Sequence, residues 1–415
     1  MPNENIAYDN SENVKFLEMK KCSIFQLFIT LNCIFLCGCI TKYNSKEIDE
    51  ATDILVVEGV ITDDESTITL TRSVNINEQG YWDPVSIDNA NVYVECDDGT
   101  QTQPALYDPP NYSTAERYDR VGRYIVKTGR LNPERKYRLK IEVDNYEYVS
   151  DYSYPIKTPE IDSVFWRKRA QGEPVMIYIA TRVPDDDVLY FRWSYKEDWE
   201  INSEIDRETN VSPVFALPHR CWDKYISRDI FLGSSENVIS DEIAEIITEI
   251  PPSNRRLSVL YRIVVKQNAI SKRAYDYFVN IKKNSENIGS IFAPTPAELR
   301  GNIVCITDPG RPAIGYIDVS STTQKTKFIS RRDNFHETPS YIDCNIYSKD
   351  FLIETDGIIV EGGERALPPW YEQHPPGSNT YVHVRCVDCR WPEPGRFPRT
   401  YTEPTTQKPD DWPIN

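Results

Sequence analysis

Two cysteines near the end of the chain, Cys386 and Cys389, have a spacing that can do chemistry. A Cys-x-x-Cys pair can act as a thiol redox site or supply half of a zinc site. A redox site needs its first cysteine at the N-terminus of a helix, whereas prolines and β-branched residues surround this pair. His374 and His383 lie nearby in the sequence, but the chain has no second paired motif. The pair is therefore expected to form structural disulfides, with zinc binding and thiol chemistry as less favoured alternatives.

A third cysteine, Cys39, ends a stretch with the order of a secretory signal. Two lysines precede a mainly apolar run over residues 24–36, which closes on Leu-Cys-Gly-Cys. This ending resembles a bacterial lipobox, in which the cysteine after a small residue receives diacylglycerol and becomes the new N-terminus. A run of about 13 residues is too short to cross a hydrocarbon core of about 30 Å. We expect Cys39 to be lipidated, residues 19–38 to be a lipoprotein signal peptide, and residues 1–18 to be a gene-model extension.

Removal of the signal and acylation of Cys39 leave an even set of six cysteines: Cys96, Cys221, Cys305, Cys344, Cys386 and Cys389. An even number in an exported chain favours disulfides, because that compartment does not keep thiols reduced. The sequence alone does not choose among the possible pairings. One arrangement joins Cys344 to one member of the Cys386/Cys389 pair, and Cys221 to Cys305.

The histidines and acidic residues give no specific catalytic signal. His219, His336, His374 and His383 are scattered, and none lies in a Gly-x-Ser-x-Gly or His-Glu-x-x-His context. A Ser-His-Asp hydrolase stays a rival hypothesis, because such a triad can assemble from distant residues. The three acids at 185–187 could hold calcium, but at the start of a strand they are more often a solvated turn. We expect no catalytic residue, no metal site and no cofactor.

Aromatic side chains in expected loops are better candidates for contact with a partner or ligand. Trp82 precedes an Asp-Pro turn, and Tyr112 and Tyr118 lie in a polar insertion over residues 107–120. Exposed aromatic rings give a large contact area at a small entropic cost. Packing within the protein is the competing explanation for each of them.

The overall composition favours a folded, sheet-rich chain that avoids nucleic acid. The chain is 40% hydrophobic and 12% aromatic, with 26 tyrosines against three methionines, a bias that is typical of sheets. Its formal net charge of −17 repels phosphate backbones and anionic lipid surfaces. Nucleic acid is therefore not an expected partner, and the membrane would be reached through the acyl chains on Cys39.

The first folded part is expected over residues 51–157, after a polar tether over 39–50. Residues 137–143 show its pattern best, because apolar and charged side chains alternate with a period of two. Several such segments with no helical pattern between them favour an immunoglobulin-like β-sandwich. Two prolines within residues 155–159 interrupt both helices and sheets, and mark the expected boundary.

A larger β-rich domain with two inserted helices is expected over residues 158–365. Alternation at 189–196 predicts a strand. The helix near 240–250 is predicted from an apolar stripe at helical spacing, formed by Ile243, Ile246, Ile247 and Ile250. The helix near 271–286 opens at a serine and has a stripe of its own, Ala274, Phe278 and Ile281. Residues 366–415 contain ten prolines and are expected to form an irregular strap, with tryptophans pinning it to the body.

In the order of its parts the chain resembles a family, the Bacteroidota outer-membrane lipoproteins of domain-of-unknown-function family 4249. Residues 55–63 are similar to the opening strand of the family, residues 159–163 to its interdomain signature, and residues 296–317 to the segment after its helix. The ending over 386–413 is the most specific match. It departs from the family at Asp411, where an aromatic residue is usual before the tryptophan.

The resemblance implies an accessory lipoprotein that works beside a TonB-dependent transporter of the outer membrane. The family has no established catalytic residues, so none is carried over. We expect a non-enzymatic, lipid-anchored outer-membrane protein that acts as a ligand-binding or lid component of such a transporter, with a ligand that the sequence does not name. The alternatives are a surface hydrolase with a cleft between its domains, and a non-catalytic adhesin or scaffold. Residues 40–44 favour neither face of the membrane.

Overall fold

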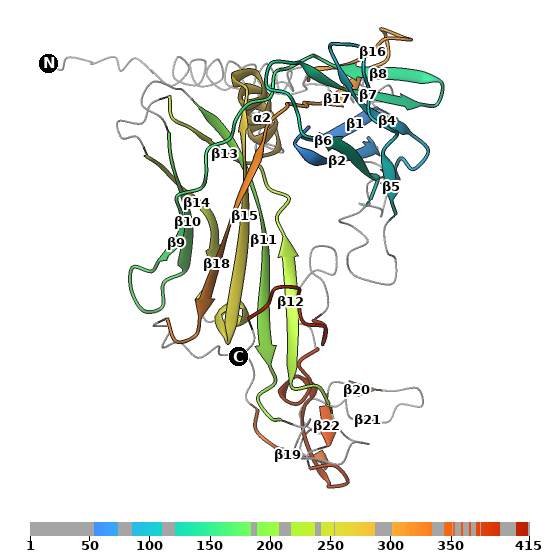
Figure 1. Ribbon diagram of the computed structural model, residues 1–415. Coiled ribbons are helices and arrows are strands. Elements are labelled where there is room, and N and C mark those ends of the chain that lie inside the picture. The colour runs from blue at the N-terminus through green and yellow to red at the C-terminus, as the bar shows by residue number, and fades with distance from the viewer. Residues whose placement is uncertain are drawn as a thin grey trace, which may run out of the picture. The chain divides into compact units, whose positions relative to one another are not determined.

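The computed structural model describes residues 54–73, 85–109, 121–183, 189–206, 217–236, 242–252, 254–286, 301–333, 344–350, 352, 358–359, 365–366, 371–373, 375–390 and 404–413. The fold is mainly β, as the sequence predicted (Figure 1). The described elements include the α-helix α2 (Lys272–Glu286) and the 3-10 turns η3 (Arg255–Leu257) and η4 (Val384–Cys386), and residues 349, 350 and 352 are also helical. In the same ranges no helix is long and apolar enough to cross a membrane.

The first hydrophobic core lies between a six-stranded and a four-stranded sheet. The larger sheet has the order β17-β1-β2-β6-β5, with β3 on β2, and the smaller has the order β16-β8-β7-β4. Alternation explains the packing: on β7, Leu139 and Ile141 are buried, whereas Lys140 pairs with Glu142 at 3.1 Å on the outer face. The strands are β1 (Leu55–Gly59), β2 (Asp64–Arg72), β3 (Val85–Ser86), β4 (Asn91–Cys96), β5 (Leu106–Asp108), β6 (Arg123–Gly129), β7 (Tyr137–Val143), β8 (Tyr146–Ser150), β16 (Ile303–Cys305) and β17 (Ala313–Gly315).

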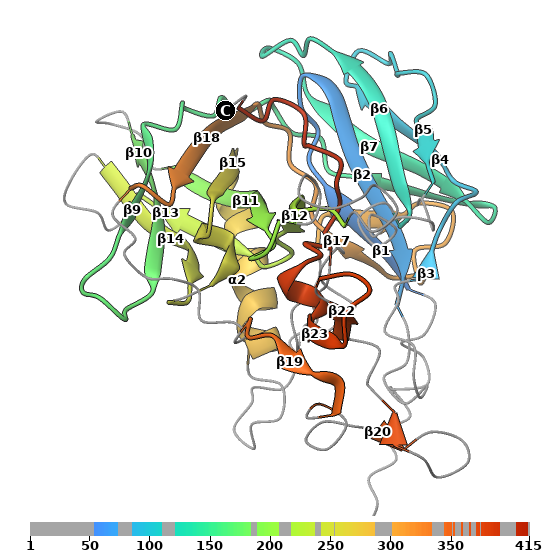
Figure 2. The same ribbon diagram turned by 90° about the horizontal axis from the view of Figure 1, so that it is seen from below.

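Two strands of this first core come from residues far along the chain. β17 pairs in parallel with β1 (Figure 2), and β16 pairs antiparallel with β8 (Figure 1). Ile317 and Val319 belong to the same hydrophobic cluster. The close approach requires glycine at 301, where a Cβ atom would lie 1.5 Å from the carbonyl oxygen of Gly315. The sequence assigned this segment to the second domain, whereas here it completes the core of the first part. An immunoglobulin-like shape for that part stays a prediction.

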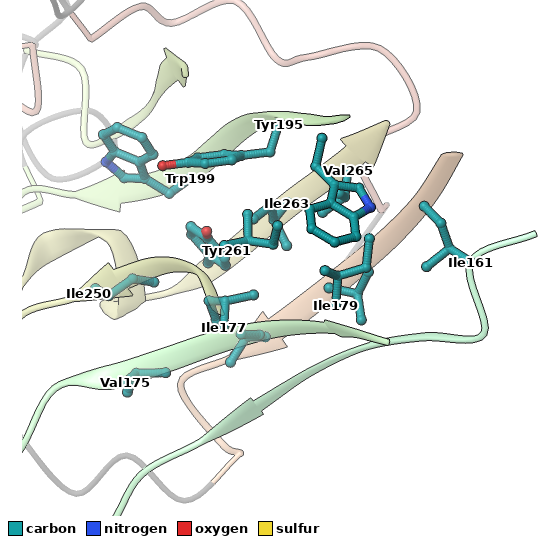
Figure 3. Packing of buried hydrophobic residues seen from close by; sticks show 14 of the residues in the cluster. Ile161, Val175, Ile177, Ile179, Tyr195, Trp199, Ile250, Tyr261, Ile263 and Val265 are labelled. Carbon is teal, nitrogen blue, oxygen red and sulfur yellow. The ribbon is translucent and has the colours of Figure 1, made fainter. Parts of the chain in front are cut away.

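The second hydrophobic core lies between a three-stranded and a five-stranded sheet. The three-stranded sheet has the order β14-β10-β9, and the larger has the order β12-β11-β15-β18, with β13 on β11. Figure 3 shows Ile177 and Ile179 of β10 facing Tyr261 and Ile263 of β15. The strands are β9 (Ser163–Arg167), β10 (Val175–Arg182), β11 (Tyr190–Asn202), β12 (Arg220–Ile226), β13 (Phe231–Ser234), β14 (Glu242–Ile250), β15 (Leu260–Ile270) and β18 (Thr322–Ser330).

The helix predicted near 240–250 is wrong, because this segment is strand β14. A β-bulge explains the error. Residues 247 and 248 both oppose Ile177, so the register shifts by one at that point. The shift turns Ile243, Ile247 and Ile250 to the same buried face, with the spacing of a helix, while Ile246 is 45% exposed.

The helix predicted near 271–286 is confirmed as α2. Ser271 caps it, because its hydroxyl oxygen accepts from the amide of Ala274 at 3.2 Å. Asp318 in turn accepts from the amide of Ser271 at 2.8 Å. Ala274 and Phe278 are buried, and Ile281 is packed against their cluster. The helix is therefore tied at its start to the segment that returns to the first core.

The C-terminal region is partly regular, where the sequence predicted an irregular strap. Within residues 366–415, β22 and β23 belong to a three-stranded sheet with the order β19-β23-β22, whose strand β19 precedes the predicted strap. β20 and β21 form a separate small hairpin, also before most of the strap. Trp412 is buried, so one tryptophan pins this region to the body, while Trp370 and Trp391 lie outside the described residues. The strands are β19 (Tyr347–Ser348), β20 (Ile358–Ile359), β21 (Arg365–Ala366), β22 (Tyr371–Gln373) and β23 (Thr380–His383).

Candidate functional site

Strand β11 carries two different sets of side chains on its two faces. Odd-numbered residues face the second core, and Phe191, Trp193 and Trp199 are almost fully buried there. Even-numbered residues face the other side, where Ser194 is exposed and Lys196 is partly exposed. Because β15 pairs with β11 over nearly its whole length, its residues alternate in the same way. The five-stranded sheet therefore has a polar outer face opposite its core.

Two elements cover the ends of this outer face. At one end, Tyr190 joins the hydrophobic cluster of α2, and the guanidinium of Arg192 lies 4.4 Å from the centre of the Phe278 ring. At the other end, the outward residues Asp198 and Glu200 are only 1% and 2% exposed. The part between these covered ends holds the exposed polar residues.

The cover at the second end is residues 404–413, which we call the terminal segment. Thr405 and Trp222 exchange two backbone hydrogen bonds of 2.7 Å each. The indole Nε1 of Trp412 donates to Oε2 of Glu200 at 3.2 Å. Arg262 donates from Nη1 to the carbonyl oxygen of Asp410 at 2.8 Å. The segment is thus fastened to three strands of the sheet, β12, β11 and β15.

A groove of about 1100 Å³ lies on the outer face beside the terminal segment. Its volume is slightly above the range of about 300–1,000 Å³ that is usual for sites of small molecules. Pairing of the strands arranges its floor in rows, such as Ile226, Lys196, Val264 and Thr326. The floor consists of Trp222, Lys224 and Ile226 of β12, Ser194, Lys196 and Asp198 of β11, Arg262, Val264 and Lys266 of β15, and Gln324, Thr326 and Phe328 of β18. The wall consists of Thr405, Gln407, Lys408, Pro409, Asp410 and Asp411.

The floor of the groove is positively charged although the whole chain is acidic. Lys196, Lys224, Lys266 and Arg262 line it, against the single outward carboxylate of Asp198. Asp223 also touches the groove, but alternation turns its side chain to the opposite face. The floor therefore favours an anionic ligand, and low ionic strength would strengthen that preference.

Asp198 is held by its neighbours rather than exposed to the groove. Arg262 donates to its Oδ2 from Nη2 at 2.7 Å and from Nε at 3.0 Å. Lys196 lies 3.3 Å from its Oδ1. A bidentate guanidinium pair fixes both partners in one geometry. Lys266 is exposed, and in the described part of the chain it has no ion pair.

Trp222 is a buried aromatic residue in the lining of the groove. It is 7% exposed, and the guanidinium of Arg220 lies 5.1 Å from the centre of its ring. Its Nε1 is buried and has no acceptor among the described protein atoms. A buried N–H without an acceptor costs about 1–3 kcal/mol, so such groups are rare in folded proteins. Nε1 of Trp222 is therefore a buried donor without an acceptor among the described protein atoms, on a side chain that lines the groove.

The core face of the same strands holds a closed polar cluster around Glu197. Tyr261 donates its hydroxyl to Oε1 of Glu197 at 2.5 Å, and Arg256 donates to both carboxylate oxygens at about 3 Å. Burial, followed by the charge of Glu197, raises the pKa of Tyr261 well above its usual range. Glu197 and Tyr261 are fully buried. This cluster therefore stabilises the core and offers no access to a substrate.

Comparison with known proteins places the chain in a family. A model of a domain of unknown function, DUF4249, matches residues 40–326, which is well over half of the chain. The chain belongs to the DUF4249 family. No curated protein matches the chain. The DUF4249 match covers the groove strands β11, β12 and β15 and ends within β18, so the terminal segment that forms the wall lies beyond it.

The disulfides of this DUF4249 protein differ in part from the arrangement predicted. Cys344 is bonded to Cys386, a member of the Cys-x-x-Cys pair, as expected. The predicted bond between Cys221 and Cys305 is wrong, because Cys221 is bonded to Cys389. Cys305 is a free, buried cysteine within the first core, and Cys96 is also free and buried. The return of residues 303–319 to that core carries Cys305 away from Cys221.

These bonds also bear on the two alternative hypotheses for the Cys-x-x-Cys pair, zinc binding and thiol chemistry. Cys386 and Cys389 are bonded to different partners, Cys344 and Cys221. Neither sulfur is left as a thiolate, which both metal binding and thiol exchange require. Within the described ranges no group of histidine, cysteine or acidic residues could hold a metal ion. In this DUF4249 protein the pair fastens the C-terminal region to the body.

One serine and histidine pair approaches the geometry of a hydrolase. Oγ of Ser203 lies 2.9 Å from Nδ1 of His219. Ser203 is 3% exposed, however, and its hydroxyl donates to the carbonyl oxygen of Ile205 at 3.0 Å. Ile205 in turn donates its amide to the carbonyl oxygen of Cys386 at 2.7 Å. The pair therefore holds the chain against the disulfide region, and its serine is not open to a substrate.

Several predicted site residues lie outside the described residues, namely Cys39, Trp82, Tyr112, Tyr118, His336, His374 and the acids at 185–187. The groove, conversely, was not predicted as a site. The sequence did contain a signal for the groove, because the polar residues Ser194 and Lys196 alternate with the aromatic residues Trp193 and Tyr195. This alternation indicates a strand with one polar face. The sequence does not show that β12, β15 and β18 add lysine and aromatic residues to the same face.

Proposed function

We propose that this DUF4249 protein is a lipid-anchored, non-enzymatic protein of the outer membrane that binds a ligand in the groove and assists a TonB-dependent transporter. The observation that carries the binding role is the groove itself. It is a polar hollow of about 1100 Å³ on a five-stranded sheet, with charged side chains in its lining. Sites built on strands hold their side chains more firmly than sites on loops.

The chemistry of the groove supports binding rather than catalysis. A general acid or base needs a titratable group that is free to exchange a proton with the substrate. Asp198 is instead fixed by Arg262 and Lys196, and Glu200 accepts from Trp412 and from Arg220. The lysines on the floor are suited to attract and orient an anion. These groups can recognise a ligand without changing it.

The membrane part of the proposal rests on the sequence around Cys39 and on the family. The lipobox-like ending at Cys39 supplies the anchor, and the resemblance of the chain to accessory lipoproteins supplies the transporter. We place the protein at the outer membrane on those two grounds. The ligand would be captured by the groove and passed to the channel.

The experiment that tests this function uses the full chain in its native membrane. Detergent extraction and affinity purification should recover a TonB-dependent transporter with the protein. Cys39→Ser should release the protein into the soluble fraction and abolish the recovery, because it removes the acyl chains. Cys37→Ser is the matched control, since it makes the same change two residues earlier and should leave both properties unchanged. Envelope attachment of Cys39→Ser at unchanged size would refute the anchor.

The rival hydrolase function has one observation in its favour, the 2.9 Å contact between Ser203 and His219. It predicts that Ser203→Ala abolishes release of products from glycan or peptide arrays. The binding function predicts that the unaltered protein releases no product from them.

A further inference from the structure

We propose that the groove recognises an acidic oligosaccharide, one that carries a carboxylate on successive sugar units. This inference names the ligand class of the proposed binding function and rests on that function. It depends on three features of the groove: the line of lysines on its floor, the mixture of donors and acceptors around that line, and the indole N–H of Trp222.

The three lysines of the floor form a diagonal line across three neighbouring strands. Lys266 of β15 pairs with Ser194, which is two residues before Lys196 on β11. Lys224 of β12 pairs with Asp198, which is two residues after Lys196. Each step moves one strand across, about 4.8 Å, and two residues along, about 6.8 Å, which gives about 8 Å between neighbouring lysines. The line is thus about 16 Å long, which exceeds one small anion and matches a short polymer with repeated negative charges.

The other groups around the line suit hydroxyl groups. Ser194 and Thr326 on the floor can donate or accept, and Gln407 in the wall can do both through its amide. Asp410 and Asp411 in the wall can only accept when ionised. A sugar hydroxyl both donates and accepts, so it can form a hydrogen bond with each of these groups. An acidic sugar would thus place its carboxylates on the lysines and its hydroxyls along the wall.

An acidic peptide fits the same groove less well. The floor strands β11 and β15 lie inside the sheet, and their backbone groups are used by pairing with strands on both sides. A peptide backbone would therefore find no main-chain partners there, although strand addition depends on them.

Trp222 lies at the β12 end of the lysine line, two residues from Lys224. Its buried Nε1 has no acceptor among the described protein atoms, and a ligand oxygen at this end of the groove would supply one. Arg220 lies over its ring, so we assign to Trp222 a donor role and no stacking role.

The experiment measures binding of tetragalacturonate to the full chain in detergent by titration calorimetry. Its fully methyl-esterified form is the matched ligand, because it keeps the sugar and removes the charge. The acid form should bind at least about tenfold more tightly. Lys266→Gln and Lys224→Gln should each weaken its binding about two- to fivefold, as expected for exposed ion pairs. Lys327→Gln is the control variant, since Lys327 lies on β18 with its side chain on the opposite face, and it should have no effect.

Trp222→Phe tests the indole donor separately. It should weaken binding of the acid several-fold. Because it also removes ring volume from a side chain that is only 7% exposed, the melting temperature should fall somewhat, and binding is therefore compared at a temperature where both proteins are folded. Equal binding by Trp222→Phe would overturn the donor role.

The outcomes separate this inference from the proposed function. Equal binding of the acid and its ester, tighter binding of hexaglutamate than of the acid sugar, or no binding of either while a transporter is still recovered would overturn the ligand class and leave the function standing. Selective binding of the acid without recovery of a transporter would support the ligand class and overturn the transporter role.

Discussion

Replacing Trp412 by alanine should loosen the terminal segment, which forms the wall of the groove. Trp412 is 3% exposed, packs edge-on against Phe328 with ring centres 5.9 Å apart, and donates to Glu200. Truncation of a buried tryptophan costs about 3–5 kcal/mol. Among the described residues, the other fastenings include the two backbone bonds of Thr405 and the bond from Arg262, each worth about 1 kcal/mol or somewhat more, and the burial of Pro404. The indole therefore supplies a large part of the attachment.

Two amides report the detachment directly. The amide of Thr405 donates to the carbonyl oxygen of Trp222, and the amide of Trp222 donates to that of Thr405. A loss of about 3 kcal/mol raises the open population about 100-fold, since each 1.4 kcal/mol is a factor of ten. Hydrogen exchange at both amides should accelerate by that factor in Trp412→Ala. Amides between β11 and β15 should keep their protection, because the sheet itself is not altered.

Trp412→Phe is the matched variant for this experiment. It keeps an aromatic ring in the site but removes the donor to Glu200, so its exchange should accelerate about tenfold, between the other two proteins. Unchanged exchange at Thr405 and Trp222 in the alanine variant would refute the reasoning, because it would show that the indole does not hold the segment.

Three further predictions concern the body of the protein. Replacing Cys344 and Cys386 together by alanine should destabilise the region that they close by up to about 4 kcal/mol, the entropic value for their sequence separation of 42 residues, measured by denaturant unfolding. Burial raises the pKa of Asp318 above its ordinary 3.8. The contribution of the protonated carboxyl to the free energy of unfolding is therefore complete below pH 3.8 and is lost as the pH rises through the raised pKa. Over the same pH interval, the stability of Asp318→Asn should increase relative to that of the unaltered protein. Gly301→Ala should destabilise the protein by more than about 3 kcal/mol, because its Cβ would overlap a backbone oxygen, whereas Gly310→Ala, with one side-chain contact at 3.4 Å, should change stability by less than about 1 kcal/mol.

Each of these has an outcome that contradicts it. Unfolding of the double cysteine variant at the same denaturant concentration would show that the bond does not restrain the unfolded chain. A constant stability difference between Asp318→Asn and the unaltered protein from pH 3 to 7 would show that the carboxyl is not perturbed. Equal stability of the two glycine variants would show that the chain can move apart at Gly301.

Local patterns predicted the strands well and failed where a distant partner decides the outcome. The period of two over residues 137–143 sufficed for β7, because one face meets the core and the other meets water. The helix predicted near 240–250 failed because the bulge opposite Ile177 gives a strand the apolar spacing of a helix. A bulge is set by pairing with another strand, so residues 240–250 alone do not contain that information.

The cysteines show the same limit. The even number of cysteines and the expected export of the chain predicted disulfides, and Cys344 does pair with a member of the Cys-x-x-Cys motif. The partner of Cys221 was wrong because Cys305 is carried into another core by pairing of β16 with β8. The groove was missed for a related reason. Its lysines come from three strands, and their alignment on one diagonal depends on the register between those strands.

The parallel pairing of β1 with β17 imposes an order of events on folding. Leu55 pairs with Ala313, which lies 258 positions later, so the edge strand β1 gains its partner only after Ala313 has been synthesised. During synthesis the first hydrophobic core lacks some of its side chains until residue 319 has left the ribosome. Contacts between residues so far apart in the sequence slow folding. A truncation at the expected boundary near residue 157 would leave that edge open and would yield an aggregation-prone fragment. Any shortened form intended for expression should therefore end beyond residue 319.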